Sequence, residues 1–555
     1  MSKYFELVEG SFTQEHFDKQ NEYPYVAYSV DEDRVIYSKI EYNEQESYLT
    51  FTALEDNSTV GLNQLSSQQT IEYSYDKSSW TNMGTNTTIN LNTNNKVYLR
   101  GLLSGDNNVW ENEYTQFKMT GKIAASGNCN SIWNYQDLNA PLKVGCGYNM
   151  FGKCTSLITA PELPATELAD YCYGSMFMGC SSLITAPELP ATELAEGVYY
   201  YMFAGCSQLV EAQKLLPALS LTKGWEYYLM FANCSSLTTS PELPATTLAE
   251  SCYESMFWMC TSLTTSPELP ATTLANRCYY GMFNDCTSLT TVLELPATTL
   301  AESCYEYMFL DCPKLNTIPT ILPATTLAES CYKYMFYNCT SLTTSPELQA
   351  TTLVNNCYFG MFVGCTSLIT APELPATTLA DSCYKQMFEG CTSLTTAPEL
   401  PATTLVDNCY FGMFAGCTSL TTAPELPATT LAERCYALMF YGCTSLTTVP
   451  AILPATELAN ECYNSMFEKC TSLTTAPELP ATELVDSCYY EMFMSCSKLS
   501  SIKCLANCLL TGSCVSAWLV SVSPTGTFYK HPDMNDWSRG VSGIPEGWTV
   551  LDAEI

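Results

Sequence analysis

The feature that most constrains this chain is the dipeptide Met-Phe, which recurs fourteen times and is followed each time, after two residues, by cysteine. The spacing is 26 residues with three small insertions, and the trailing cysteines are Cys154, Cys180, Cys206, Cys234, Cys260, Cys286, Cys312, Cys339, Cys365, Cys391, Cys417, Cys443, Cys470 and Cys496. A fixed period of this size is typical of a solenoid, whose repeats pack only against their neighbours. The sequence therefore predicts one elongated array, and function is expected on its surface.

One repeat can be interpreted slot by slot, because the same residue type returns once per coil. Leucine stands three residues after the trailing cysteine in all fourteen repeats, and Leu or Ile stands nine residues after it. The segment Leu-Thr-Thr-Ala-Pro-Glu-Leu should be extended, with its prolines limiting regular strand pairing. The segment Cys-Tyr-x-x-Met-Phe-x-x-Cys has apolar residues at i, i+4, i+5 and i+8, which predicts one or two inward-facing turns of helix.

The rest of the chain flanks this array. Residues 1–44 are polar and mixed, and two short strands are expected there, at Tyr23–Tyr28 and from Arg34. Residues 45–125 contain strand-length β-branched and aromatic runs separated by Asn-, Ser- and Gly-rich turns, which favour a small β-sandwich. Residues 126–500 are the solenoid with its lead-in, and residues 501–555 break the period and form a C-terminal cap. The predicted fold is mostly β with short helical turns, in about fourteen coils.

Thirty cysteines would ordinarily indicate a disulfide framework. Twelve repeats carry an earlier cysteine eight residues before the trailing one, but Val198 and Glu226 replace it in two repeats whose trailing cysteines persist. An obligate pair should be lost together, so rows of buried free thiols explain the pattern better than disulfides. Zinc is the weakest alternative, because the repeats lack tight Cys-x-x-Cys pairs.

Charge excludes several classes of partner. Only 14% of residues are charged, yet 57 acids against 23 bases give a formal charge of −34. Nucleic acid and anionic membranes are disfavoured, since phosphate binding needs a basic face. The sequence has no run of 18 apolar residues, so membrane insertion is not expected. It also shows no secretory signal, so we expect the protein to be made in a reducing cytosol.

The chain offers almost no raw material for catalysis. Its two histidines, His16 and His531, lie outside the repeats, and no phosphate-binding glycine motif appears. No catalytic residue, no cofactor and no firm metal site are predicted, and the protein is not expected to be an enzyme.

One polar feature does rise above background, a row of glutamates eight residues after the trailing cysteine. It comprises Glu162, Glu188, Glu242, Glu268, Glu294, Glu347, Glu373, Glu399, Glu425 and Glu478, interrupted by Lys214, Thr320, Ala451 and Cys504. Carboxylates stacked roughly 5 Å apart repel by on the order of 1 kcal/mol per pair near water. Either the side chains splay into solvent, or they form a stripe that recruits Ca²⁺ or a basic partner. Threonine pairs such as Thr395-Thr396 form a second row, suited to solubility or to contact with a glycan or protein.

The repeated residues Phe-x-x-Cys-Thr-Ser-Leu-Thr-Thr, followed by a Pro-flanked strand and a second apolar run, resemble leucine-rich repeats of the BspA-like class. The resemblance covers residues 146–500. Ile71-Glu-Tyr-Ser-Tyr and Gly543-Ile-Pro-Glu-Gly-Trp look like flanking modules of such proteins in gut Bacteroidetes and their crAss-like phages. The resemblance implies a non-enzymatic, surface-displayed adhesion or interaction protein.

The resemblance and the missing signal together predict a phage virion fibre or decoration protein. Residues 1–44 would attach it to other virion proteins, and the solenoid would contact a host surface protein or glycan. A homo-oligomer is expected by analogy with fibres, although no coiled-coil heptads support a trimer. A bacterial cell-surface adhesin is the alternative, and a polysaccharide-acting enzyme is the third.

Overall fold

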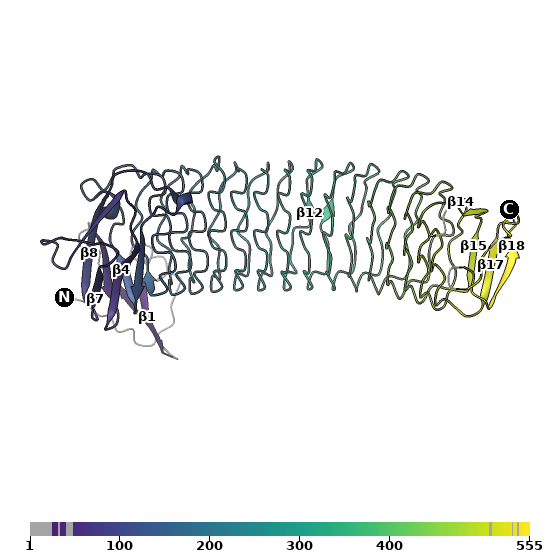
Figure 1. Cartoon of the computed structure of the whole chain (residues 1–555), viewed down its shortest axis with the longest axis horizontal. Coiled ribbons are helices and arrows are strands. Elements are labelled where there is room, and N and C mark those ends of the chain that lie inside the picture. The colour runs from purple at the N-terminus through teal and green to yellow at the C-terminus, as the bar shows by residue number, and fades with distance from the viewer. Residues whose placement is uncertain are drawn as a thin grey trace, which may run out of the picture.

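The computed structural model shows one long, gently curved solenoid with a β-rich domain at one end and a small sheet at the other (Figure 1). The structure describes residues 25–31, 34–39, 48–509, 513–535, 537–540 and 543–554. Two strands, β1 (Tyr25–Asp31) and β2 (Arg34–Lys39), pair antiparallel. The rest of the predicted attachment segment, residues 1–44, lies outside the described residues.

The domain that precedes the coils is built from two sheets. One has the order β11-β10-β3-β8-β5-β6 and the other β7-β4-β9. The core lies between them, where Phe51 of β3 meets Phe117 of β9 with ring centroids 5.2 Å apart. Strand β8 alternates buried and more exposed residues, as a strand with one face on a core does. The bounds are β3 (Leu49–Ala53), β4 (Ser58–Gln64), β5 (Gln69–Ser74), β6 (Thr81–Asn82), β7 (Thr88–Leu91), β8 (Lys96–Leu103), β9 (Gln116–Thr120), β10 (Ile123–Ser126) and β11 (Leu157–Thr159).

The coils contain almost no regular secondary structure. Their extended segments join neighbouring coils mainly through single parallel bridges, such as Thr265↔Thr291 and Thr299↔Thr326. The few strands within or just after the coils are β12 (Ile321–Leu322), β13 (Glu347–Leu348), β14 (Glu483–Leu484) and β16 (Cys508–Leu509). Proline breaks the pairing, because it supplies no N–H to a neighbouring strand. Among the described residues the helices are η2 (Val109–Glu111) and α2 (Ser131–Asn134), and none is long enough to cross a bilayer.

The prediction of helical turns in the Cys-Tyr-x-x-Met-Phe-x-x-Cys segment is wrong. Here alternate N–H groups serve two different partners. The N–H of Phe257 donates to the carbonyl of Met282 in the next coil at 2.9 Å, whereas the N–H of Met256 donates to Tyr253, three residues back, at 3.2 Å. Every fourth residue has a positive φ, as at Ser251 (54°) and Ser255 (53°). The segment is therefore a run of consecutive turns, and its bonds to the next coil replace the i→i−4 ladder of a helix.

Two aromatic rows run through the interior. The phenylalanines of successive coils stack with ring centroids 5.5 Å apart at Phe177–Phe203 and 5.7 Å apart at Phe362–Phe388. The tyrosines that follow the early cysteine stack in the same way, at 5.6 Å for Tyr332–Tyr358. These rings are at most 1% exposed from Phe151 to Phe493 and from Tyr173 to Tyr489, and they belong to one hydrophobic core shared with the sandwich. The rows close each coil and hold neighbouring coils in register.

The cysteines are free thiols, which confirms the prediction of thiol rows over disulfides. None of the thirty forms a disulfide, and every one except Cys508 is buried. From Cys180 onward, each trailing thiol donates to the carbonyl of a phenylalanine one coil earlier, as in Cys365 Sγ to Phe336 O at 3.0 Å, and Cys154 donates to Phe117 O of β9. Burial raises the pKa of these thiols, for Cys260, Cys365 and Cys443 to about 12. Protonated sulfur thus acts as a small apolar residue that also carries a donor.

At the first coil the rows continue into the preceding domain. Phe117 stacks on Phe151 with centroids 5.5 Å apart, and its N–H donates to Met150 as a coil phenylalanine would. Trp133 of α2 packs on Tyr173 at 5.8 Å. The edge of the array is thereby covered by residues that imitate a coil, which solenoids need at their ends.

The prediction that the period ends at residue 500 is wrong, because the C-terminal region contains one further coil. Cys514 stands 26 residues after Cys488, and the N–H of Tyr489 donates to its carbonyl at 2.9 Å, the bond made in earlier coils. The indole of Trp518 stacks on Tyr489 at 6.3 Å, and Trp537 stacks on Trp518 at 5.5 Å. A further coil is therefore hidden here because Trp518 fills the end of the tyrosine row. Strands β15 (Ser501–Cys504), β17 (Gly526–Lys530) and β18 (Trp548–Asp552) follow as a parallel sheet.

Candidate interaction surface

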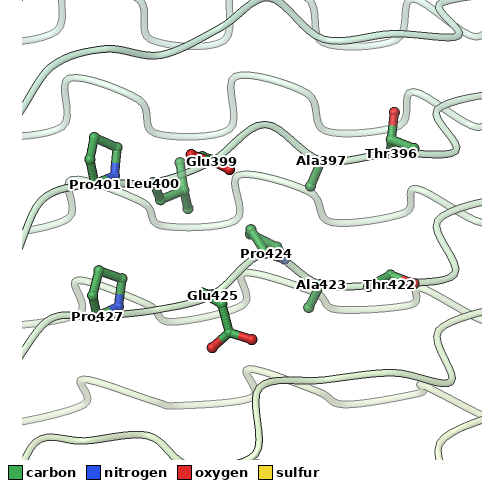
Figure 2. A pocket seen from close by; sticks show the side chains of 10 residues that line it. All are labelled: Thr396, Ala397, Glu399, Leu400, Pro401, Thr422, Ala423, Pro424, Glu425 and Pro427. Carbon is green, nitrogen blue, oxygen red and sulfur yellow. The ribbon is translucent and has the colours of Figure 1, made fainter.

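The extended side of the coils carries the predicted threonine and glutamate rows. In one coil Leu394 is buried, Thr395, Thr396 and Glu399 are exposed, and Leu400 is buried again. Figure 2 shows that Thr396 and Glu399 lie along one run of chain, with Thr422 and Glu425 on the next run. We call these exposed Thr-Thr and Glu positions, repeated from coil to coil, the rank face. Buried leucines on both sides of the Thr-Thr pair hold it outward.

The threonines of the rank face are in register between many neighbouring coils. Bridges join Thr265 to Thr291 and Thr422 to Thr448. Some hydroxyls reach the previous coil, as Thr290 Oγ1 does to Thr264 O at 3.1 Å. A second set of exposed threonine pairs, after the buried Ala402 and its equivalents, occupies the same position in eight successive coils from Thr246-Thr247 to Thr429-Thr430. The surface thus repeats one polar pattern at the coil spacing.

The glutamates are distributed as follows. Glu162 and Glu478 are half-buried, and the exposed members are Glu188, Glu242, Glu268, Glu294, Glu347, Glu373, Glu399 and Glu425. Glu399 and Glu425 line a groove of about 500 Å³ between two coils, but their carboxylates point in different directions with Pro424 between them (Figure 2). Glu478 pairs with Lys503 at 3.1 Å. Across the described residues, no three acidic, histidine or cysteine side chains are grouped so as to hold a metal ion.

The interruptions of the glutamate row differ from those predicted. The bridges set Glu242 against Leu215, Glu347 against Ile321 and Glu478 against Ile452. In each of these coils one inserted residue shifts the register by one position. Leu215, Ile321 and Ile452 therefore stand in the glutamate row, in place of the predicted Lys214, Thr320 and Ala451. Leu215 and Ile452 are 42% and 43% exposed, while Leu216 and Leu453 fill the buried slot. In these coils the buried slot is therefore ten residues after the trailing cysteine instead of nine.

A different surface is formed by the variable residues beside the turns, such as Lys333, Phe359 and Lys385; we call it the turn face. Lys333 pairs with Glu306 at 3.0 Å. The ammonium of Lys385 lies over Phe359 at 5.2 Å and over Phe411 at 4.9 Å. Charges on this face are thus largely matched from coil to coil by a neighbour. Sequence reasoning missed these contacts, although the period places the residues side by side.

The structure describes one of the two histidines, His531. The Nδ1 of His531 accepts the backbone N–H of Asp533 at 3.1 Å and lies 3.9 Å from the carboxylate of the same residue. His16 lies outside the described residues. Cys504, Cys508 and Cys514 form no disulfide; Cys504 and Cys514 are buried and Cys508 is half-buried.

A cleft at the junction of sandwich and solenoid was also missed. It lies beneath the loop after β8 and is lined in part by Asn108, Trp110, Asp170 and Tyr171. Trp110 is 72% exposed, the largest exposed fraction among the large hydrophobic side chains of the described chain. A tryptophan in a polar loop was the available signal, but it has no counterpart in the repeats to mark it.

Comparison with known proteins identifies the repeats. The family model for the BspA type leucine rich repeat region (6 copies) matches residues 226–343, 251–395, 325–437 and 413–515, which together span more than half of the chain. A leucine-rich repeat protein from Bacteroides ovatus ATCC 8483 is similar at 18% identity, over 73% of this chain and 86% of that one, with a TM-score of 0.38. A chain from the TLR13–ssRNA13 complex is similar at 12% identity, over 72% of this chain and 54% of that one, with a TM-score of 0.19. No curated protein matches the sequence.

Proposed function

The chain belongs to the BspA-type leucine-rich repeat family, and from that premise we propose that it is a non-enzymatic recognition protein whose rank face binds a polymeric surface glycan. The carrying observation is the repetition of the same exposed Thr-Thr and Glu positions along the array. A ligand that is itself periodic meets equivalent contacts in successive coils, so weak contacts add through avidity. Hydroxyls of threonine donate and accept, which suits the hydroxyls of sugars.

Charge narrows the class of glycan. The rank face presents carboxylates at most coils, and the whole chain carries a formal charge of −34. A polyanionic glycan would be repelled, so we propose a neutral or amine-bearing polymer. A protein partner with a basic surface is the second candidate, favoured by the same glutamates.

The binding test compares two matched variants of the full chain on immobilised bacterial surface polysaccharides and on whole bacterial cells. Thr395→Lys with Thr421→Lys places long cations on two exposed positions of the rank face and should weaken binding at least tenfold. Lys385→Thr is combined with Lys469→Thr, since the ammonium of Lys469 lies 4.4 Å over the Tyr441 ring on the turn face; this variant should leave binding within twofold. The proposal would be refuted if the unmodified chain bound neither the polysaccharides nor the cells, or if both variants lost the same amount of binding.

The resemblance of the flanking segments leads us to propose a phage virion as the carrier, with residues 1–44 as the attachment segment and a homo-oligomer as the displayed form. A bacterial cell-surface adhesin is the alternative. Mass spectrometry of purified virions and of isolated cell envelopes separates the two, since the virion proposal requires the chain in particles. Release of reducing ends from a polysaccharide by the purified chain would instead support the enzyme alternative.

A cation or basic partner on the glutamate row stays a prediction of its own. If calcium binds there, millimolar calcium should raise the melting temperature of the unmodified chain and not that of a Glu399→Gln, Glu425→Gln variant. An equal response in both proteins would remove the idea.

A further inference from the structure

The loop between β8 and η2 is pinned to the first coil. The N–H of Asn107 donates to Val144 O at 3.0 Å, and its side-chain Nδ2 donates to Gly145 O at 3.1 Å. In return, Val144 N–H donates to the carboxylate of Asp106 at 3.1 Å. Val109 is buried beneath the loop. The cleft under the loop, about 270 Å³ in volume, is therefore held open by bonds within the fold.

Two aromatic side chains from different elements meet at this cleft. Trp110 of η2 lies edge to face with Tyr171, with ring centroids 5.3 Å apart and planes at 78°. The phenol of Tyr171 donates to Glu196 at 2.7 Å, which fixes its ring. Most of the indole of Trp110 remains exposed to solvent. Exposed apolar surface of this size is unfavourable unless a ligand or partner covers it.

Tyr171 carries a bulky aromatic side chain at a coil position with a positive φ. The residue before the early cysteine has a positive φ in coil after coil; Ser or Asn occupies the position in seven of the fourteen coils and Gly in two, and the other five coils carry a larger side chain, Tyr171 among them. A bulky side chain in this conformation carries a backbone cost that Ser, Asn and Gly reduce. Tyr171, at φ 57°, bears that cost while contributing an aromatic wall to the cleft.

The two carboxylates of the lining are hydrogen-bond acceptors. One carboxylate oxygen of Asp106 takes the Val144 N–H, and one of Asp170 takes the Glu196 N–H at 3.1 Å. The second oxygen of each carboxylate and the amide of Asn108 are chemically suited to sugar hydroxyls. Phosphate, sulfate and acidic sugars are disfavoured by two carboxylates. Lys143, beside the lining residue Val144, already places an ammonium at Ser104 O, 2.8 Å away, which works against a second cation.

We propose that this junction cleft binds a neutral mono- or disaccharide unit, with the exposed indole of Trp110 packing on the apolar face of a pyranose and Asp106 and Asp170 accepting its hydroxyls. The volume lies just below the roughly 300–1,000 Å³ of sites for drug-sized ligands, which suits one or two sugar rings. The site is separate from the rank face and does not depend on the function proposed for that surface.

The test uses the full chain, a panel of neutral hexoses, N-acetylhexosamines and their disaccharides, and saturation-transfer NMR followed by calorimetry. At least one sugar should bind at a single site, and Trp110→Ala and Tyr171→Ser should each raise its Kd at least tenfold. Trp225→Ser is the matched control, because Trp225 occupies the same coil position two coils later and is 41% exposed outside the cleft; its Kd should stay within twofold.

Melting curves for the three variants show whether each is folded, and serine is native at the Tyr171 position in other coils, so Tyr171→Ser should fold. Absence of binding by every sugar below 10 mM, or unchanged affinity in folded Trp110→Ala, would overturn the proposal. A third result would also overturn the proposal: oligolysine binds the unmodified chain, Trp110→Ala abolishes that binding, and no sugar binds. The cleft would then be assigned to a cationic ligand.

Discussion

The sandwich and the solenoid solve the same problem in opposite ways. The sandwich closes through antiparallel ladders, and its core mixes residue types such as Leu49, Phe51, Val60 and Ile71. The solenoid closes through rows in which one residue type recurs in every coil. All thirty cysteines lie from Cys129 onward, so residues 48–126 contain none. Any change that attacks thiols or a single interior row should therefore separate the two regions.

The largest effect is expected from alkaline pH. A thiol titrates near 9.0 when exposed and near 12 when buried, as at Cys365. Between these values the folded state holds more protons than the unfolded state, so the stability present below pH 9 is lost as the pH rises. Each thiol contributes about 1.4 kcal/mol per pH unit in that window. Far-UV circular dichroism should show the solenoid unfolding above pH 9, while brief proteolysis still yields an intact sandwich. Earlier loss of the sandwich would contradict the comparison.

The next effect is expected from breaking an aromatic row. Phe336 is buried and stacks at 5.6 Å on both Phe309 and Phe362. Phe336→Ala removes both contacts and leaves a cavity, so it should cost about 3–5 kcal/mol of unfolding free energy. Urea unfolding measures the loss, and hydrogen exchange should place it in the coils around residue 336. Equal loss of protection in the sandwich would show that the two regions unfold as one unit.

A smaller effect should distinguish the two cysteine rows. The trailing Cys391 donates to Phe362 O at 3.1 Å, whereas valine naturally replaces the early cysteine at Val198. Cys391→Val loses a hydrogen bond and changes the shape of the core, so it should cost about 1–3 kcal/mol. Cys383→Val should cost less than about 1 kcal/mol, because the early row already accepts valine. The reverse order in urea midpoints would show that the thiol bond contributes nothing.

The smallest effect concerns the turns. Leu438 has φ 57°, a conformation that other coils fill with glycine at Gly360 and Gly412. Leu438→Gly should stabilise the protein by up to about 1 kcal/mol. Glycine removes the steric penalty of the left-handed conformation, but part of this gain is offset because glycine loses more conformational entropy on folding. Gly412→Leu, the reverse exchange, should destabilise it by about 1–2 kcal/mol. Thermal melting of both variants measures the pair, and the same sign for both would argue against strain.

Much of the solenoid could be predicted because a buried slot repeats with the chain period. Leu394, Phe388 and Cys391 were expected to be internal, and they are. The turns were misread because apolar residues four apart suit both a helix and a run of four-residue turns. Asn408, Gly412 and Gly416, also four apart, carried the signal for positive φ. The hidden last coil escaped because Trp518 replaces the usual Met-Phe pattern.

The candidate surface was predictable in part. The Thr and Glu rows follow from the period, but the register across the insertions does not, because one added residue moves Ile321 or Ile452 into the glutamate position. The direction of a long exposed side chain such as Glu425 also depends on its neighbours, here Pro424 (Figure 2). The junction cleft depends on contacts between distant segments, and no local pattern reports them.

The most direct test of the recognition proposal is the excision of whole coils. Removing residues 366–391 deletes one 26-residue period and joins Cys365 to Thr392 in register, and removing residues 366–443 deletes three. Affinity for an immobilised polysaccharide that binds the full chain should fall stepwise with the number of coils removed, while circular dichroism shows a folded solenoid. Unchanged affinity after the loss of three coils, in a folded variant, would contradict recognition by the repeated surface.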